Sequence, residues 1–328
     1  MMRPITLCTY QWLDIPFDTL CHKAKSFGFD GLELACASDH FEVDKADIDY
    51  CNLKKEKLAK NGLEVFAISC HPIGQAVSDR IDQRHKNLLP ERIWGDGKPE
   101  EVRKRAAEEV IKIGEAAARL GISTVNGFTG SPIWHLAYSF PPVPSSMIEE
   151  GFEEFANSWV PILNEYEKLG VRFALEVHPT EIAFDIASAR KTLDALNNHI
   201  AFGFNYDPSH MGYQGVDYVK FIQIFKDRIF HVHMKDVMWS EFPAEAGVFG
   251  GHTTFGALER YWDFRSLGRG RINFEEIIRN LNRINYNGPL SIEWEDNGMN
   301  REYGAKDACD FVRKLDFPSS NIEFDSIF

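Results

Sequence analysis

Short apolar runs alternate with longer amphipathic segments along this sequence. The short runs predict eight buried strands, at residues 5–10, 31–36, 63–69, 122–128, 171–177, 200–206, 228–234 and 289–295. The longer segments predict helices near residues 16–27, 48–61, 99–120, 145–169, 184–197, 215–226, 273–285 and 301–315. In the helix near 99–120, acidic residues occupy the first turn and Gly121 follows the end, as is typical of helix termini.

Eight strands alternating with eight helices predict an α/β fold, namely a (β/α)8 TIM barrel that forms one domain over residues 1–328. A doubly wound open sheet is the competing architecture, but it usually has fewer strands and a Gly-rich first turn. No G-x-G-x-x-G motif follows the first strand, and no G-x-x-x-x-G-K-[ST] motif occurs. Two insertions, near residues 71–98 and 235–272, follow strands, so we expect them on the C-terminal face, which carries the site in such barrels.

Composition narrows the possible partners. The formal net charge of −13 disfavours nucleic acid and anionic membranes, and it is compatible with a small neutral substrate and a divalent cation. No apolar run reaches the ~18 residues of a membrane span. The first residues lack the apolar core and cleavage site of a signal peptide, so we expect a cytoplasmic protein. The six cysteines form no C-x-x-C pair, which argues against zinc-ribbon and redox sites.

Potential metal ligands stand at the ends of four successive strands in the second half of the chain. These strand ends carry Glu176 and His178, then Asp207 and His210, then His231, His233 and Lys235, and finally Glu293 and Glu295. A single residue of this kind is more often structural than a ligand. Four consecutive strand ends are harder to obtain by chance, because buried carboxylates need a cation or a hydrogen-bond partner.

We expect one divalent metal ion, held by Glu176, Asp207, His233 and Glu293 after barrel closure brings these strand ends together. Three carboxylates and an imidazole suit Mn²⁺, which we favour, and also Mg²⁺, Co²⁺ or Zn²⁺. His231 shares a strand face with His233 but lies about 6–7 Å further back along the strand. We therefore expect His231 to orient a ligand by a hydrogen bond and not to bind the metal.

The stretches "LEVHP", "YDPSH", "HVHMKD" and "IEWE" resemble the sugar isomerase/epimerase group with the xylose isomerase-like barrel. This group includes ketose 3-epimerases, inosose dehydratase and hydroxypyruvate isomerase, and the resemblance covers nearly the whole chain. It implies the same four metal ligands, and it implies that Glu176 and Glu293 also move protons. His210 would reach a substrate oxygen near the metal. Endonuclease IV is a distant relative, but Phe128 and Thr129 stand where it needs a further His, so we reject that activity.

The chemistry that fits is proton abstraction next to the carbonyl of a ketose or a related polyol ketone. Glu176 and Glu293 lie on strands three apart, so they would face each other across the cavity as the catalytic pair. Seven residues near the strand ends are candidates for contact with a carbohydrate substrate: Trp12, His71, His135, His178, His210, Lys235 and Arg271.

Two other functions remain open. The first is elimination on 3-keto-glycosides, or an inosose dehydratase-like lyase reaction, in which His135 would be the base. The enzymes that cleave C-glycosides in this way work with a small β-rich partner chain, whereas an epimerase could be a homo-oligomer. The second is a carbohydrate-binding barrel without catalysis, which would lack ligand residues, and none of the four is missing here.

Overall fold

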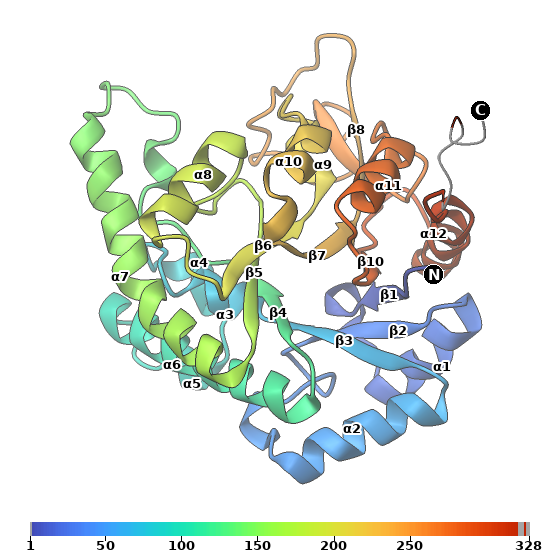
Figure 1. Ribbon diagram of the computed structural model, residues 1–328. Coiled ribbons are helices and arrows are strands. Elements are labelled where there is room, and N and C mark those ends of the chain that lie inside the picture. The colour runs from blue at the N-terminus through green and yellow to red at the C-terminus, as the bar shows by residue number, and fades with distance from the viewer. Residues whose placement is uncertain (1, 321–324, 326–328) are drawn as a thin grey trace.

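The computed structural model describes residues 2–320 and residue 325, and eight parallel strands close into a barrel inside a layer of helices (Figure 1). The barrel strands are β1 (Ile5–Cys8), β2 (Gly31–Ala35), β3 (Glu64–Ser69), β4 (Thr124–Gly127), β5 (Arg172–Glu176), β6 (Phe202–Tyr206), β7 (Ile229–Met234) and β10 (Leu290–Ile292). Their order is β1-β10-β7-β6-β5-β4-β3-β2, and β2 pairs with β1 to close the barrel. The predicted (β/α)8 TIM barrel is confirmed.

The helices between the strands also follow the predicted pattern. They are α1 (Phe17–Phe27), α2 (Ile48–Lys60), α6 (Pro99–Leu120), α7 (Ser145–Leu169), α8 (Ile186–Ala195), α10 (Tyr218–Ile224), α11 (Phe274–Arg283) and α12 (Arg301–Leu315). The strand at 5–10 ends earlier than expected, because the chain turns into a 3-10 helix at Tyr10–Trp12 directly after β1. None of the described helices has the length and apolar character needed to cross a membrane.

The two insertions contain secondary structure of their own. The first, after β3, folds into three short helices, α3 (His71–Gln75), α4 (Gln83–Lys86) and α5 (Glu91–Trp94). The second, after β7, contains a two-stranded antiparallel sheet of β8 (Asp236–Trp239) and β9 (Trp262–Arg265). A further short helix, α9 (Pro208–Gly212), follows β6 directly. Because these pieces follow barrel strands, they build the C-terminal face.

The helical layer is held against its neighbours by close packing, which α6 and α7 illustrate. Tyr166 of α7 is fully buried and its hydroxyl donates a hydrogen bond to the backbone oxygen of Val110 at 2.8 Å. Gly114 of α6 makes this approach possible, because a Cβ atom at that position would stand 2.5 Å from the Tyr166 ring.

Polar side chains fill part of the barrel interior beneath the C-terminal face. Barrels of this kind are usually filled by branched apolar residues. The polar side chains of the barrel strands that are at most 1% exposed include Glu33, Asn126, Asn205, His231 and Ser291. The strand register brings them together, since Asn205 pairs with His231 across β6 and β7, and Ser291 pairs with His233 across β10 and β7.

Candidate metal and active site

Four neighbouring strands of the barrel bring three carboxylates and one imidazole together. Glu176 ends β5, Asp207 follows β6, His233 lies near the end of β7, and Glu293 follows β10. One ligand-type atom from each of the four residues lies within 4.8 Å of the others, and none of the residues is more than 9% exposed. The four residues expected to bind the metal are therefore close enough to hold one divalent ion.

The hydrogen bonds of Asp207 indicate whether these four residues suit a cation. As the N-cap of α9, it uses Oδ1 to accept a hydrogen bond from the backbone amide of Ser209 at 2.7 Å. Its Oδ2 is buried and, among the described residues, accepts no hydrogen bond, although Nε2 of His210 lies 3.3 Å away. A buried carboxylate oxygen without a partner is costly. A cation in the group would satisfy this oxygen.

Glu176 is surrounded by three imidazoles. Its Oε2 lies 2.8 Å from Nε2 of His71 and 3.2 Å from Nδ1 of His233, and its Oε1 lies 3.2 Å from Nε2 of His210. Burial alone would raise the pKa of Glu176, but His233 and the other two imidazoles outweigh it and hold the pKa well below its ordinary value. Glu176 is therefore ionised, as both a metal ligand and a proton acceptor must be.

Glu293 faces a buried lysine. Its Oε2 lies 3.0 Å from Nζ of Lys235, and its Oε1 accepts a hydrogen bond from Nε2 of Gln11 at 3.0 Å. Lys235 also lies 3.3 Å from Glu295. Burial opposes the charged form of Glu293, yet Lys235 lowers the pKa of Glu293 to about 2, with help from His233. Burial opposes the charge on Lys235 in the same way, but Glu293 and Glu295 raise its pKa well above the ordinary value.

His178 and His210 form the next layer of the site. Their ring centroids are 4.1 Å apart in an edge-to-face arrangement. Burial and the neighbouring His210 hold the pKa of His178 well below its ordinary value, so His178 is neutral. Burial opposes a charge on His210, but Asp207 and Glu176 raise its pKa to about 9. The two pKa values therefore shift in opposite directions, and His210 is the more basic of the two rings.

An aromatic wall from the second insertion stands beside these groups. The ring of Phe264, on β9, lies 5.5 Å from the ring of His210, and Nζ of Lys235 lies 4.2 Å from the centre of the Phe264 ring. Further out, Trp262 stacks on Tyr213 with ring centroids 3.9 Å apart. The β8–β9 sheet therefore forms one side of the site.

Three of the residues expected to contact substrate have other surroundings than the metal-ligand group. Trp12 is fully buried, where it packs against Phe27 and beneath the guanidinium of Arg301, so we leave it out of the substrate site. Arg271 pairs with Glu241 at 2.6 Å. His135 lies in a 3-10 helix at Trp134–Leu136 and lines a separate cavity of about 360 Å³ with Gln75, Thr180 and others.

Glu33 lies beside His231 and His233, and no role was predicted for it. It is fully buried on β2, and its Oε2 lies 2.7 Å from Nε2 of His231 and 3.0 Å from Nε2 of His233. Burial alone would raise the pKa of Glu33, but His233 and His231 hold it well below its ordinary value. A charged residue inside the apolar run "GLELAC" was the signal that could have pointed to it.

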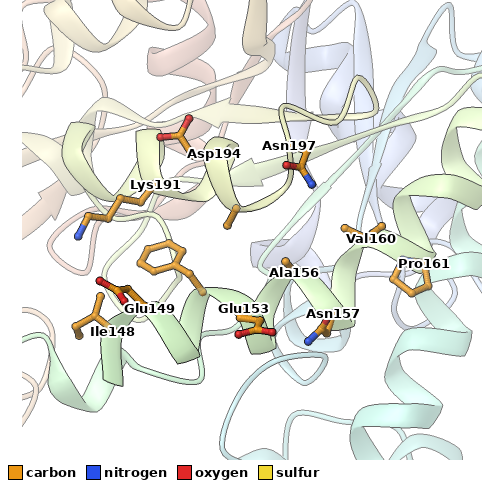
Figure 2. A pocket seen from close by; sticks show the side chains of 12 residues that line it. Ile148, Glu149, Glu153, Ala156, Asn157, Val160, Pro161, Lys191, Asp194 and Asn197 are labelled. Carbon is orange, nitrogen blue, oxygen red and sulfur yellow. The ribbon is translucent and has the colours of Figure 1, made fainter. Parts of the chain in front are cut away.

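The outer surface carries a groove that is separate from this site. It lies between α7 and α8, has a volume of about 790 Å³, and is shown in Figure 2. Its lining is apolar at Phe152, Ala156 and Val160, with Glu149 and Lys191 among the charged residues around it. None of the residues that line this groove belongs to the metal-ligand group. The chemistry of the candidate metal site therefore lies in its side chains and not in the groove.

A family model matches most of the chain. Residues 21–315 match the model of the xylose isomerase-like TIM barrel. The chain belongs to this family. A curated relative, the uncharacterized protein YfiH of Bacillus subtilis (strain 168), is 24% identical over 325 residues, which cover 92% of this chain and 95% of YfiH.

Solved structures have the same fold at low sequence identity. The 3-keto-D-glucoside 4-epimerase YcjR from E. coli has a TM-score of 0.68 and 16% identity, over 95% of this chain and 99% of YcjR. The probable 3-DHS dehydratase AsbF from Bacillus anthracis has a TM-score of 0.66 and 18% identity, over 94% and 98% of the two chains. The IOLI protein with a bound zinc atom has a TM-score of 0.64 and 16% identity, over 95% and 98%.

Proposed function

We propose that this protein is a divalent-metal-dependent sugar isomerase or epimerase that removes a proton next to a carbonyl. The observation that carries the proposal is the convergence of Glu176, Asp207, His233 and Glu293 within 4.8 Å at four neighbouring strand ends. The epimerase YcjR supports it as a protein of the same fold.

The metal would be Mn²⁺ by preference, with Mg²⁺, Co²⁺ or Zn²⁺ as alternatives, because the ligand set has three carboxylates, one imidazole and no thiolate. When bound, a divalent ion polarises a substrate carbonyl and stabilises negative charge on its oxygen. The zinc atom in the IOLI structure supports a metal in a protein of this fold. Oδ2 of Asp207 supports it from within this chain, since this buried oxygen accepts no hydrogen bond from the described residues although His210 lies 3.3 Å away.

Glu176 and Glu293 would move the proton. They stand on β5 and after β10, on either side of β6 and β7 in the barrel order, so a carbon held between them has a carboxylate on each side. One carboxylate accepts the proton and the other returns it, which inverts the carbon in an epimerase. His210 and Lys235 lie next to the pair and would donate hydrogen bonds to substrate oxygens.

Elimination on a 3-keto-glycoside or an inosose is the second candidate reaction. It uses the same metal and carbonyl but needs a base aimed at a proton further from the metal. His135 is the candidate base, since partial desolvation and the charge of Arg80 lower its pKa. Because His135 lines the cavity described above, the substrate of an elimination would have to reach from the metal into that cavity. The dehydratase AsbF supports this alternative as another neighbour of the same fold.

The experiment is metal analysis followed by incubation with ketoses, inososes and 3-keto-glycosides in D₂O. Under the main proposal we expect one divalent ion per chain and deuterium at a carbon next to the carbonyl. Elimination would instead give loss of water or of an aglycone. A metal-free protein that exchanges no proton in any of these substrates would contradict the proposal.

Variants distinguish the two reactions. Glu176→Gln should lower turnover at least ~10²–10⁴-fold, the usual cost of losing a general base, in samples shown to retain the metal. His135→Ala should have a smaller effect under the epimerase mechanism. If His135→Ala is inactive while Glu176→Gln keeps metal and substantial activity, the two-carboxylate mechanism is wrong and elimination is favoured.

A further inference from the structure

Glu33 carries a negative charge in the middle of the barrel, and four side chains from three other strands are directed at it. Asn126 of β4 donates to its Oε1 at 2.8 Å, and Ser291 of β10 donates to its Oε2 at 2.6 Å. His231 and His233 of β7 approach with their Nε2 atoms at 2.7 and 3.0 Å. Buried charges are expensive even when paired, so a barrel that needed only stability would gain from apolar residues here.

The two nitrogens of His233 face opposite ways. Its Nε2 points to Glu33, with both carboxylate oxygens at 3.0–3.1 Å. Its Nδ1 points to the proposed metal ligands, 3.2 Å from Oε2 of Glu176 and 3.3 Å from Oε2 of Glu293. A carboxylate can only accept hydrogen bonds, so Glu33 favours a proton on the nitrogen that faces it. Nδ2 of Asn126 also lies 3.2 Å from this nitrogen, but it donates to Glu33 at 2.8 Å. Nδ1 faces carboxylates too, and a metal ion bound by Glu176 and Glu293 would take the place of a proton there and bind the Nδ1 lone pair of a neutral His233 ring.

We propose that Glu33 is the positioning residue of the metal centre: it fixes His233 in the tautomer whose Nδ1 binds the ion. Such outer carboxylates orient a metal-binding imidazole and make it a stronger ligand. Asn126, Ser291 and His231 in turn hold Glu33 in place through the remaining hydrogen bonds. This inference rests on the proposed metal site, and it adds a residue that touches neither the metal nor the substrate.

Glu33→Gln tests the inference because it preserves shape but replaces one acceptor oxygen with an NH₂ group. If that group faces His233, the ring must accept through Nε2 and carry its proton on Nδ1, where it blocks the metal. Glu181→Gln is the matched control, since Glu181 is also a fully buried carboxylate on the C-terminal face but bonds to Thr129 and Gly130.

The measurement is Mn²⁺ affinity of the chelator-stripped, full-length proteins, from the EPR signal of free Mn²⁺ at increasing metal concentration. We expect Glu33→Gln to bind Mn²⁺ about 10–100-fold more weakly than the native protein, while Glu181→Gln binds it as the native protein does. Equal affinity of Glu33→Gln and the native protein would overturn the positioning role and leave the proposed function intact. A native protein that binds no Mn²⁺ and no Zn²⁺ would overturn both.

A second measurement needs no variant, in case Glu33→Gln does not fold. Long-range ¹H–¹⁵N spectra of the native protein, with and without Zn²⁺, report which nitrogen of His233 carries the proton. We expect the proton on Nε2 and a zinc-dependent shift of Nδ1. A proton on Nδ1 in the zinc-bound protein, with Nε2 shifted by the metal, would refute the assignment.

Discussion

Glu181 should make the protein less stable as the pH rises from about 5 to 8. Its side chain is fully buried, and burial raises its pKa from 4.5 to about 8, even though the backbone amides of Thr129 and Gly130 donate to its Oε2 at 2.7 Å each. In the unfolded chain the carboxyl ionises near its ordinary pKa. Between these two pKa values the folded protein holds a proton that the unfolded chain has lost.

The sign and the size of the effect follow from this difference. Because the folded state binds more protons, the free energy of unfolding falls as the pH rises, by at most about 1.4 kcal/mol per pH unit. Over the whole interval from 4.5 to about 8 the loss is at most roughly 5 kcal/mol. Stability from this group is complete below pH 4.5 and is lost as the pH approaches 8.

Glu181→Gln isolates the effect, since the amide cannot ionise and its oxygen can still accept from Thr129 and Gly130. Urea unfolding of the native protein and the variant at pH 5, 6, 7 and 8 gives two curves of unfolding free energy. Their difference removes the contributions of all other titrating groups. We expect the variant to gain relative stability at each step toward pH 8. A difference that stays constant from pH 5 to 8 would show that the carboxyl ionises normally inside the fold.

Two further outcomes concern packing and the loop around the second insertion. Gly114→Ala should destabilise the protein by about 1–3 kcal/mol in urea unfolding, because its Cβ atom would stand 2.5 Å from the Tyr166 ring; unchanged stability would mean that α6 and α7 separate easily. Asp236→Asn should speed amide hydrogen exchange at Gly268 and Gly270, whose backbone amides both donate to Oδ2 of Asp236. The NH₂ group of Asn must face either these two donors or the amide of Ile272, which donates to Oδ1, so hydrogen bonds in this loop are lost. Exchange at the native rate would show that the loop holds its shape without this carboxylate.

The barrel could be predicted because every repeat carries its own signal, an apolar strand followed by an amphipathic helix. The small sheet in the second insertion could not. β8 and β9 have four residues each, and a long segment separates Trp239 at the end of β8 from Trp262 at the start of β9. Strands this short and this far apart produce no local sequence pattern that predicts their pairing. Residues 71–98 were expected as a polar insertion for a similar reason, since the helices there are only four or five residues long.

The convergence of the four candidate ligands could be predicted because the strand ends of a closed barrel meet on one face. Contacts across the barrel interior could not be predicted in this way, because they also depend on how distant strands align. Glu33 meets His233 although β2 and β7 are separated by β1 and β10 in the barrel order, and the sequence does not give that alignment. The burial of Trp12 could not be predicted either, because Trp12 lies in the 3-10 helix after β1, where strand alternation does not determine the direction of a side chain.

The β8–β9 sheet gives the protein a modular construction. The proposed metal ligands belong to barrel strands and their immediate ends, whereas Phe264, which lies beside His210 and Lys235, belongs to a hairpin whose two strands pair with each other. The connection between β8 and β9 can therefore change in length or sequence without moving the register of the barrel. A change in this hairpin would therefore alter the aromatic wall beside the proposed metal ligands while the ligands stay in place on the barrel.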